Sequence, residues 1–225
     1  MGGNWSDGAI LLTAGRTIPS FALVAVISYL LGCFNGAVLV SKFILHSDVR
    51  SFGSGNGGLT NFYRTFGGPL TFLVIGCDVL KAVLAVLAGT ALLGGPSGWA
   101  LLGKYWAGFF CMLGHVFPCM FHFKGGKGVL AGGTLALMID WRVALVVWGG
   151  FLLLFFLTRY VSLGSVYAGT AFPFATWFVF HSPLPTLLAA GCGALLVWGH
   201  RGNIRRLLHG TERKFSFHRK TEGKQ

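Results

Sequence analysis

The chain has 225 residues, of which 54% are hydrophobic and only 11% are charged. A soluble domain carries about 25% charged residues, so this composition excludes an ordinary soluble protein and predicts an all-α, polytopic integral membrane protein. The formal net charge of +12 does not indicate nucleic-acid binding, because much of it falls in the tail after the last apolar segment, as expected of a cytoplasmic end beside anionic lipid.

The chain begins with residues 1–17, which we expect to form a flexible N-terminal arm. This arm carries Asp7 and no basic start, so we expect no cleavable signal peptide. Residues 18–208 are predicted to form one membrane domain of seven transmembrane helices, and residues 209–225 a basic cytoplasmic tail. The seven apolar segments lie at about 18–45, 69–93, 99–121, 129–139, 143–158, 166–180 and 184–199.

Two of these segments carry unusual features. Asp78 and Lys81, in the second, are i,i+3 neighbours on one helix face and can pair, which is more often a packing feature than a functional one. The fourth, at 129–139, is much shorter than the roughly 20 residues of a typical span. Either the loop before it enters the membrane, or neighbouring helices shield a short helix.

The remaining segments are turns or polar loops. Residues 46–68 are polar and glycine-rich, with little to drive membrane insertion or a core. The five cysteines lie in or beside apolar segments and none forms a CxxC, so we expect no disulfide and no metal site. We also expect no cofactor.

Basic residues indicate the orientation of the chain in the membrane. With the N-terminus outside, the inner segments hold Arg64, Lys124, Lys127, Arg159 and the basic tail, while few basic residues lie outside. The asymmetry supports seven spans with the N-terminus out and the C-terminus in. It also places three polar stretches on the same cytoplasmic side.

The first polar stretch is SGNGGLTNFYR at residues 54–64. Glycines let the backbone approach a ligand, and Arg64 offers a bidentate guanidinium suited to phosphate oxygens. A plain linker has no need of so many hydrogen-bonding side chains at close intervals. Its candidate ligand-binding residues are Ser54, Gly55, Asn56, Thr60, Asn61 and Arg64.

The second stretch is GHVFPCMFHFKGGKG at residues 114–128. It places His115, Lys124 and Lys127 among glycines that can turn sharply and present backbone N–H groups. Two lysines with bare amides suit a dianion such as phosphate. The alternative is a basic loop on the inner face of a membrane protein, since GGKG falls short of a full phosphate-loop signature.

The third stretch is HRGNIRRLLHGTE at residues 200–212. His200 and Asn203 lie i,i+3 on one helix face, and Gly210 suits a helix end. A histidine has the pKa needed for proton transfer near neutral pH, although one at a membrane boundary is more often structural.

Taken in order, SGNGGLTN with Arg64, GHVFPCMFHFKGGKG and HRGNIRRLLHGTE resemble the three cytoplasmic motifs of the bacterial acyl-phosphate-dependent glycerol-3-phosphate acyltransferases, the PlsY family. The resemblance runs from about Gly32 to Glu212 with the same hydrophobic spacing. RYVSLGS, which contains Ser162, also resembles a family element. Leu59 stands where the family commonly has alanine, a departure that leaves the charged positions untouched.

The resemblance implies an acyltransferase that moves a fatty acyl group from acyl phosphate to the 1-hydroxyl of glycerol 3-phosphate. The products would be lysophosphatidic acid and inorganic phosphate, in the first step of bacterial phospholipid synthesis. It implies a multi-pass protein of the bacterial cytoplasmic (inner) membrane with its active site on the cytoplasmic face. The expected partners are the two substrates and membrane lipids, without nucleic acid, and we expect a monomer.

The same resemblance assigns roles to residues of the three stretches. We expect the catalytic residues to be His200, Asn203, Lys124, Arg64 and Ser54. We expect the substrate-binding residues to be Gly55, Asn56, Thr60, Asn61, His115, Lys127 and Ser162. The three stretches must then meet as one cationic site at the inner leaflet.

The chemistry leaves one alternative open. An acyl phosphate is a reactive mixed anhydride, so the enzyme chiefly has to align the hydroxyl and neutralise the leaving phosphate. The proton can go to His200 or to a substrate phosphate. We favour the phosphate, because His200 has no evident carboxylate partner and Glu212 lies far along the tail. The rival function is a membrane transporter of an organic phosphate anion.

Overall fold

A computed structural model of the chain describes residues 7–94 and 99–216, with residues 7–17 described by their backbone alone. Within these ranges the chain forms α-helices and short 3-10 turns and no strand, which confirms the predicted all-α fold. The elements in order are α1 (Asp7–Cys33), α2 (Gly36–Phe43), η1 (Val49–Ser51), α3 (Leu59–Thr65), α4 (Leu70–Leu93), α5 (Ala100–Val116), η2 (Cys119–Phe121), α6 (Val129–Ile139), α7 (Trp141–Thr158), α8 (Val161–Phe180), α9 (Pro183–Gly199) and α10 (Arg201–Leu208).

Each of the seven expected apolar segments is helical in the structure. By length and hydropathy, three helices in the described ranges suffice to cross a membrane: α4, α7 and α8. The number rises to five if the bent pairs α1–α2 and α9–α10 each count as one span. The count of seven spans and the orientation of the termini therefore stay predictions.

The first apolar segment is two helices rather than the single one expected. α1 ends at Cys33 and α2 begins at Gly36, with a bend of 45° between them. Asn35 causes the restart, because its side-chain oxygen accepts a hydrogen bond from the Val38 N–H at 3.1 Å and caps α2. α1 begins at Asp7, so the backbone of residues 7–17 is helical, while the flexibility of the arm stays a prediction.

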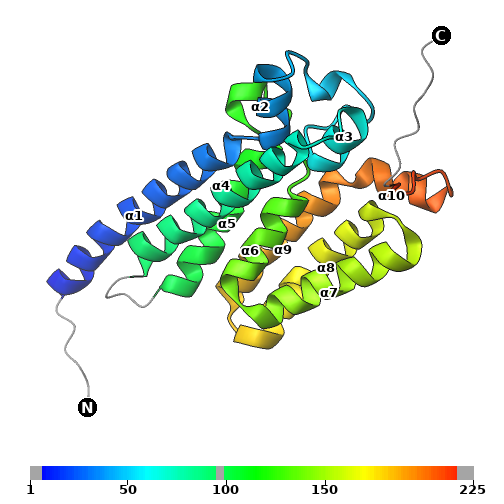
Figure 1. Cartoon of the computed structure of the whole chain (residues 1–225). Coiled ribbons are helices and arrows are strands. Elements are labelled where there is room, and N and C mark those ends of the chain that lie inside the picture. Colours follow the sequence, from blue (N-terminus) through cyan, green and yellow to red (C-terminus); the bar gives the residue numbers. More distant parts are fainter. Residues whose placement is uncertain (1–6, 95–98, 217–225) are drawn as a thin grey trace, which may run out of the picture.

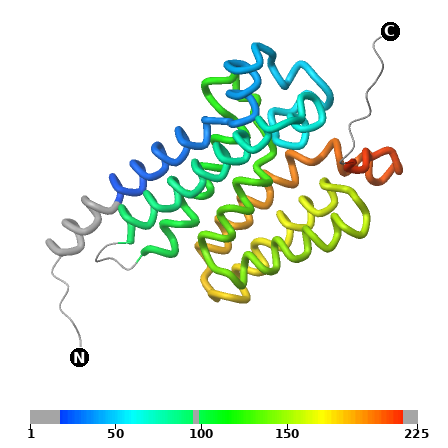
Figure 2. The backbone as a smooth tube through the Cα atoms, viewed as in Figure 1, coloured from blue at the N-terminus to red at the C-terminus, as the bar shows by residue number. Residues whose placement is uncertain are grey.

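α5 lies at the centre of the bundle, where it packs against α1, α4, α6 and α9. α1 and α4 lie on one side of α5, and α6, α7, α8 and α9 form the other side of the molecule (Figure 1). α2, α3 and α10 gather at one end of it. Figure 2 follows the chain from α1 through the cyan α3 segment at that end to the orange and red residues of α10. The three polar stretches belong to this end.

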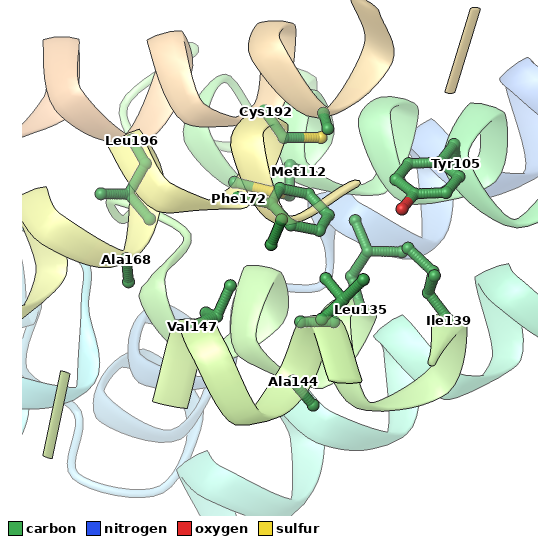
Figure 3. Packing of buried hydrophobic residues seen from close by; sticks show 14 of the residues in the cluster. Tyr105, Met112, Leu135, Ile139, Ala144, Val147, Ala168, Phe172, Cys192 and Leu196 are labelled. Carbon is green, nitrogen blue, oxygen red and sulfur yellow. The ribbon is translucent and has the colours of Figure 1, made fainter. Parts of the chain in front are cut away.

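Small residues allow the helices to approach closely, as expected where apolar helices pack in lipid. A Cβ on Gly89 of α4 would lie 2.3 Å from the carbonyl oxygen of Gly103 of α5, so the two backbones touch only because both residues are glycine. The main core fills the space between α5, α6, α7, α8 and α9, where Tyr105, Met112, Leu135, Phe172 and Leu196 interdigitate (Figure 3).

A second core lies beneath the first polar stretch. Val49 and Phe62 are fully buried and pack with Val38 of α2 and with Phe121 of the second polar stretch, whose residues 117–128 form the lysine-containing loop. The expectation that residues 46–68 contain little to drive a core is therefore wrong. A few apolar residues, diluted by glycine and polar neighbours, are enough to seat this stretch on α2 and α4.

Candidate active site

The three polar stretches border one cavity of about 290 Å³. It lies between α3, the loop before α6, the first turn of α8 and the α9–α10 break. Residues that are distant in the sequence therefore come together, as expected if the three stretches form one site. The predicted site residues that line it are Ser54, Asn56, Thr60, Asn61, Arg64, His115, Lys127, Ser162, His200 and Asn203.

Asn61 holds the first stretch in shape. Its side-chain oxygen accepts the Ser54 N–H at 3.0 Å, and its Nδ2 donates to the carbonyl oxygens of Val49, Phe52 and Asn56, each at 3.0 Å. These bonds use the polar atoms of a buried amide, so Asn61 fixes the loop that presents Ser54 and Asn56 to the cavity. Gly55, expected to bind substrate, is not among the residues that line the cavity.

The second stretch is anchored by its own backbone. The Gly125 N–H donates to the Val116 carbonyl and the Gly126 N–H to the His115 carbonyl, each at 3.1 Å. The first stretch joins it, since the Gly57 N–H donates to the Gly125 carbonyl at 3.1 Å. The two loops therefore form one hydrogen-bonded unit.

The two lysines of this loop occupy different places. Lys127 lines the cavity, whereas Lys124 is exposed and lies outside the lining residues. The reason is the left-handed backbone at His122 and Phe123, with φ values of 56° and 55°, which turns the chain before Lys124. The structure therefore does not bring Lys124 to the site with the other expected catalytic residues.

The α9–α10 break positions the third stretch. His200 is buried, and its Nδ1 lies 2.8 Å from the Leu196 carbonyl oxygen. A carbonyl only accepts, so Nδ1 carries the proton and Nε2 is left with a lone pair. The Asn203 side chain accepts a hydrogen bond from the Lys127 ammonium and donates to Glu212 Oε1 at 2.7 Å.

Glu212 is a site residue that sequence reasoning missed. Far from lying remote along the tail, it lines the cavity, because α10 ends in a turn at Gly210 (φ 67°) that sends the chain back. The Thr211 N–H donates to the Arg206 carbonyl and the Gly210 N–H to the Leu207 carbonyl, the pattern of a Schellman motif. The expectation that Gly210 ends a helix is confirmed. Because a glycine in this position reverses the chain, the same residue was the signal in the sequence that could have placed Glu212 near the site.

The Glu212 carboxylate gathers three side chains from two elements, α8 and α10. It accepts hydrogen bonds from Ser162 Oγ at 2.8 Å and Asn203 Nδ2 at 2.7 Å, and pairs with Arg206 Nε at 2.7 Å. Burial raises the pKa of this carboxyl, but the donors from Asn203, Ser162 and Arg206 outweigh burial and hold the pKa below its usual range. Glu212 is therefore an anion that fixes the neighbouring polar groups.

Residues after Glu212 pack against segments that border the site. The Phe215 N–H donates to the Arg159 carbonyl at 2.8 Å, and its ring stacks on Tyr63 with centroids 5.5 Å apart. Arg64 donates to the Arg213 carbonyl at 3.3 Å. At the start of the expected basic tail, Glu212 therefore lines the cavity, and the residues after it pack beside the site.

The electrostatics favour an anionic ligand. Among the described lining residues, Arg64, Lys127 and Arg206 supply positive charge, Glu212 offsets part of it, and the carboxylate of Asp78 is paired with the Lys81 ammonium behind the lining. Burial lowers the pKa of Lys127 to about 8, although the nearby Glu212 opposes that shift. A phosphate bound beside this ammonium would restore its full charge.

An apolar cavity adjoins the polar one. Val129, Trp148 and Phe151 line both, and the apolar cavity continues past Met112 and Phe172 between α6, α7, α8 and α9. The combined space has a cationic end and an apolar end. The apolar cavity is small, about 20 Å³, so it marks the apolar border of the cationic cavity and does not enclose a hydrocarbon chain.

Comparison with known proteins gives a consistent result. The family model described as glycerol-3-phosphate acyltransferase matches residues 22–210. A glycerol-3-phosphate acyltransferase of Photobacterium profundum is 41% identical over 197 residues, covering 87% of this chain and 93% of that protein. Its counterpart in Pseudomonas putida is 37% identical over 196 residues, covering 87% of this chain and 100% of that one.

Solved structures agree with the sequence matches. A crystal structure of PlsY (YgiH), an integral membrane glycerol 3-phosphate acyltransferase in its glycerol 3-phosphate form, superposes with a TM-score of 0.79 at 31% identity, covering 88% of this chain and 96% of that one. The lysophosphatidic acid form of the same protein gives a TM-score of 0.76. The resemblance carried by the three motifs and the predicted integral membrane fold are both confirmed.

Proposed function

The chain belongs to the glycerol-3-phosphate acyltransferase family, and we propose that it transfers a fatty acyl group from an acyl phosphate to the 1-hydroxyl of glycerol 3-phosphate. The protein is an integral membrane acyltransferase that acts on glycerol 3-phosphate. The acyl phosphate donor and the hydroxyl attacked are the finer part of the proposal. Its products are lysophosphatidic acid and inorganic phosphate.

The observation that carries the proposal is a cationic cavity of about 290 Å³ whose border becomes apolar at Val129, Trp148 and Phe151. An acyl phosphate has a dianionic head on a long hydrocarbon chain, and needs a cationic pocket with an apolar border. Glycerol 3-phosphate has no apolar part, so it takes the polar end of the space. The two substrates then meet at the apolar border.

The donor needs little chemical activation. The hydroxyl oxygen attacks the acyl carbon, the bond from that carbon to the phosphate oxygen breaks, and phosphate leaves with the electron pair. Arg64 and Lys127 stabilise the charge that grows on the departing phosphate, with Ser54 and Asn56 as neutral donors, while the Ser162 hydroxyl donates its proton to Glu212. The geometry gives a preorganised set of donors without a covalent acyl-enzyme.

The proton of the attacking hydroxyl has two possible acceptors. His200 presents the Nε2 lone pair, because its Nδ1 is bonded to the Leu196 carbonyl, and no carboxylate is bonded to that Nδ1. A substrate phosphate with a second pKa of about 6 is the other base. We assign the proton to the phosphate, and to His200 and Asn203 the role of orienting the glycerol moiety or the leaving group.

We place the site on the cytoplasmic face of a bacterial inner membrane. The cationic end of the cavity holds Arg64 and Arg206, with Arg159 and Arg213 beside it, and basic residues gather on the cytoplasmic side of membrane proteins. Both proposed substrates would reach it there, one from water and one from the inner leaflet. A monomer suffices, since the cavity is built from one chain.

The direct test uses purified protein with acyl phosphate and glycerol 3-phosphate. We expect phosphate release matched by one lysophosphatidic acid per phosphate, and no release when glycerol 3-phosphate is omitted. Product from acyl-CoA but not from acyl phosphate would overturn the choice of donor. Uptake of glycerol 3-phosphate into protein-containing vesicles without an acyl donor, and without product, would instead support the transporter.

A further inference from the structure

A buried ionic cluster lies beneath the polar end of the cavity. Asp78 and Lys81 of α4 and His115 of α5 are 1%, 3% and 3% exposed. The Lys81 ammonium lies 2.7 Å from Asp78 Oδ1 and 2.7 Å from His115 Nδ1. Burying two charges is costly, and a hydrophobic pair of similar size packs as well or better, so packing alone does not account for the cluster.

The cluster forms hydrogen bonds with the backbone at the break between α1 and α2. Lys81 donates to the carbonyl oxygens of Gly32 and Phe34, at 3.2 and 3.0 Å, and so caps the end of α1. Asp78 Oδ1 accepts the Gly36 N–H at 3.2 Å at the start of α2. A cation at a helix C-terminus and an anion at an N-terminus are each favourable, so the pair fixes the direction in which α2 leaves the break.

The cluster also binds the lysine-containing loop. Lys81 can only donate, so His115 Nδ1 accepts and Nε2 carries the ring proton. The His115 carbonyl accepts the Gly126 N–H at 3.1 Å. A Cβ on Gly126 would lie 2.2 Å from His115 Nε2, so the loop backbone rests directly on the edge of the ring. This contact sits one residue before Lys127.

The two connections meet in the site itself. α2 carries the chain toward Ser54 and Asn56, His115 supports Lys127, and the Gly57–Gly125 hydrogen bond joins the two loops. Asp78 and His115 also border the cavity. The cluster is therefore the common support of two of the three stretches that would hold phosphate.

We propose that Asp78, Lys81 and His115 are positioning residues that set the placement of the Lys127 loop against the Ser54 loop for glycerol 3-phosphate. The acceptor is the substrate affected, because glycerol 3-phosphate has no hydrocarbon chain and depends on the polar groups alone, whereas the acyl chain of the donor can also contact apolar surface such as that at Trp148. This inference rests on the proposed function. It gives His115 a role exerted through the loop rather than by direct substrate contact.

The first test removes the charges together, with Asp78→Asn and Lys81→Met in one protein, so that no unpaired charge stays buried. We expect KM for glycerol 3-phosphate to rise ten- to a hundred-fold, on the order expected for a small misplacement of binding groups, with KM for acyl phosphate nearly unchanged. Wild-type KM and kcat in this folded variant would overturn the proposal.

The second test keeps all charges satisfied. In His115→Asn the side-chain oxygen replaces Nδ1 as the acceptor for Lys81, while the ring edge against Gly126 is lost. We expect a raised KM for glycerol 3-phosphate here too. Gly126→Ala should be severe with His115 present and milder in the His115→Asn background, because the methyl group no longer meets the ring; equal effects in both backgrounds would overturn the contact.

The matched control is an equally buried polar pair away from the cavity. Tyr105 Oη and Thr176 Oγ1 lie 2.8 Å apart, both fully buried, and neither lines the site. Tyr105→Phe with Thr176→Val should leave both KM values unchanged, and a rise in KM for glycerol 3-phosphate like that of the cluster variants would reduce the cluster to a general structural role.

Absence of acyl phosphate activity in the wild type would count against the proposed function, whereas failure of the cluster variants to change KM would count against this inference.

Discussion

Single residues decide what the cavity can bind. Lys127 is held by Asn203, Asn203 by Glu212, and Glu212 by Ser162 and Arg206, so each polar group has its orientation set by the next. Groups fixed in this way need little rearrangement when charge develops in the transition state. The polar wall is thus preorganised for a phosphate.

The pH dependence follows from Lys127, whose pKa burial lowers to about 8. The ammonium is charged below that pH and loses its charge as the pH rises through it, so phosphate binding to the free enzyme weakens in the same direction. We expect kcat/KM for glycerol 3-phosphate to fall above about pH 8. In Lys127→Arg, which stays charged, the decline should move to higher pH; an unchanged profile would exclude Lys127 as its source.

The two lysines of the loop provide a matched pair. Lys127→Met should lower kcat/KM by roughly ten- to a hundred-fold, the effect of losing a charge-assisted contact worth about 1.5–3 kcal/mol. Lys124→Met should have a smaller effect, because that side chain is exposed and outside the cavity. Equal losses would mean that Lys124 swings into the site when substrate binds.

His200 offers a test of the base. If a substrate phosphate takes the proton, His200→Gln should keep turnover within about tenfold of wild type, since general-base catalysis by a side chain contributes roughly a hundred-fold or more. Single-turnover rates with preformed acyl phosphate measure this step. A loss of several thousand-fold in a folded variant would make the histidine the obligate base.

At the scale of elements, the helix ends bring the site together. The Asn35 cap directs α2 toward the first polar stretch, and the Schellman turn at Gly210 reverses the chain after α10. Neither helix is long, and α10 has eight residues. Their ends matter more than their lengths, because each end aims a loop into the cavity.

Gly210 makes the second of these turns testable. Its φ is 67°, and a Cβ there would meet nothing within 4 Å, so only backbone strain opposes a side chain. Gly210→Ala should cost about 1 kcal/mol of unfolding free energy and lower activity by loosening the return of Glu212. Gly210→Asn should lie closer to wild type, because asparagine tolerates this conformation. Melting temperature and kcat/KM measure both, and identical behaviour of the two variants would refute the argument.

The limits of sequence reasoning are also clearest at this scale. Hydropathy and turn residues were sufficient to predict the long apolar helices, although neither the break between α1 and α2 nor the short helix α3 was expected. The three stretches and the family resemblance predicted most of the polar side chains around the cavity, but not its apolar lining. The pairing of Val49 and Phe62 in a core was missed, because average polarity hides two apolar residues whose partners lie far away in the chain. Lys124 and Glu212 were misplaced for a related reason: left-handed turns at Phe123 and Gly210 reverse direction, and distance along the chain does not reveal this.

The whole molecule is a bundle that carries its polar chemistry at one end. α5 lies at its centre, and α2, α3 and α10 gather with the cavity at that end (Figure 1). Beside it, apolar side chains of α5, α6, α7, α8 and α9 surround a small apolar cavity of about 20 Å³. A substrate with a charged head and a hydrocarbon chain would therefore stand with its head at that end and its chain along the helices.

Orientation in the membrane can be tested at two exposed positions in a cysteine-free background. His209 follows α10 on the predicted inner side, and His181 lies in the turn before α9 on the predicted outer side. We expect His181→Cys to react with an impermeant maleimide in intact cells and His209→Cys only after permeabilisation. The reverse pattern would invert the proposed topology, and loss of activity in the cysteine-free parent would call for a thiol in catalysis.

The residues shared by the two cavities, Val129, Trp148 and Phe151, have a consequence for the kinetics. If the acyl chain of the donor lies against this apolar border and its head in the cationic end, both donor and product travel sideways within one leaflet. The reaction rate then depends on the surface concentration of donor in that leaflet, rather than on its total concentration in the sample. Adding inert lipid or detergent at a fixed total amount of donor should slow the reaction by surface dilution, as a two-dimensional encounter requires.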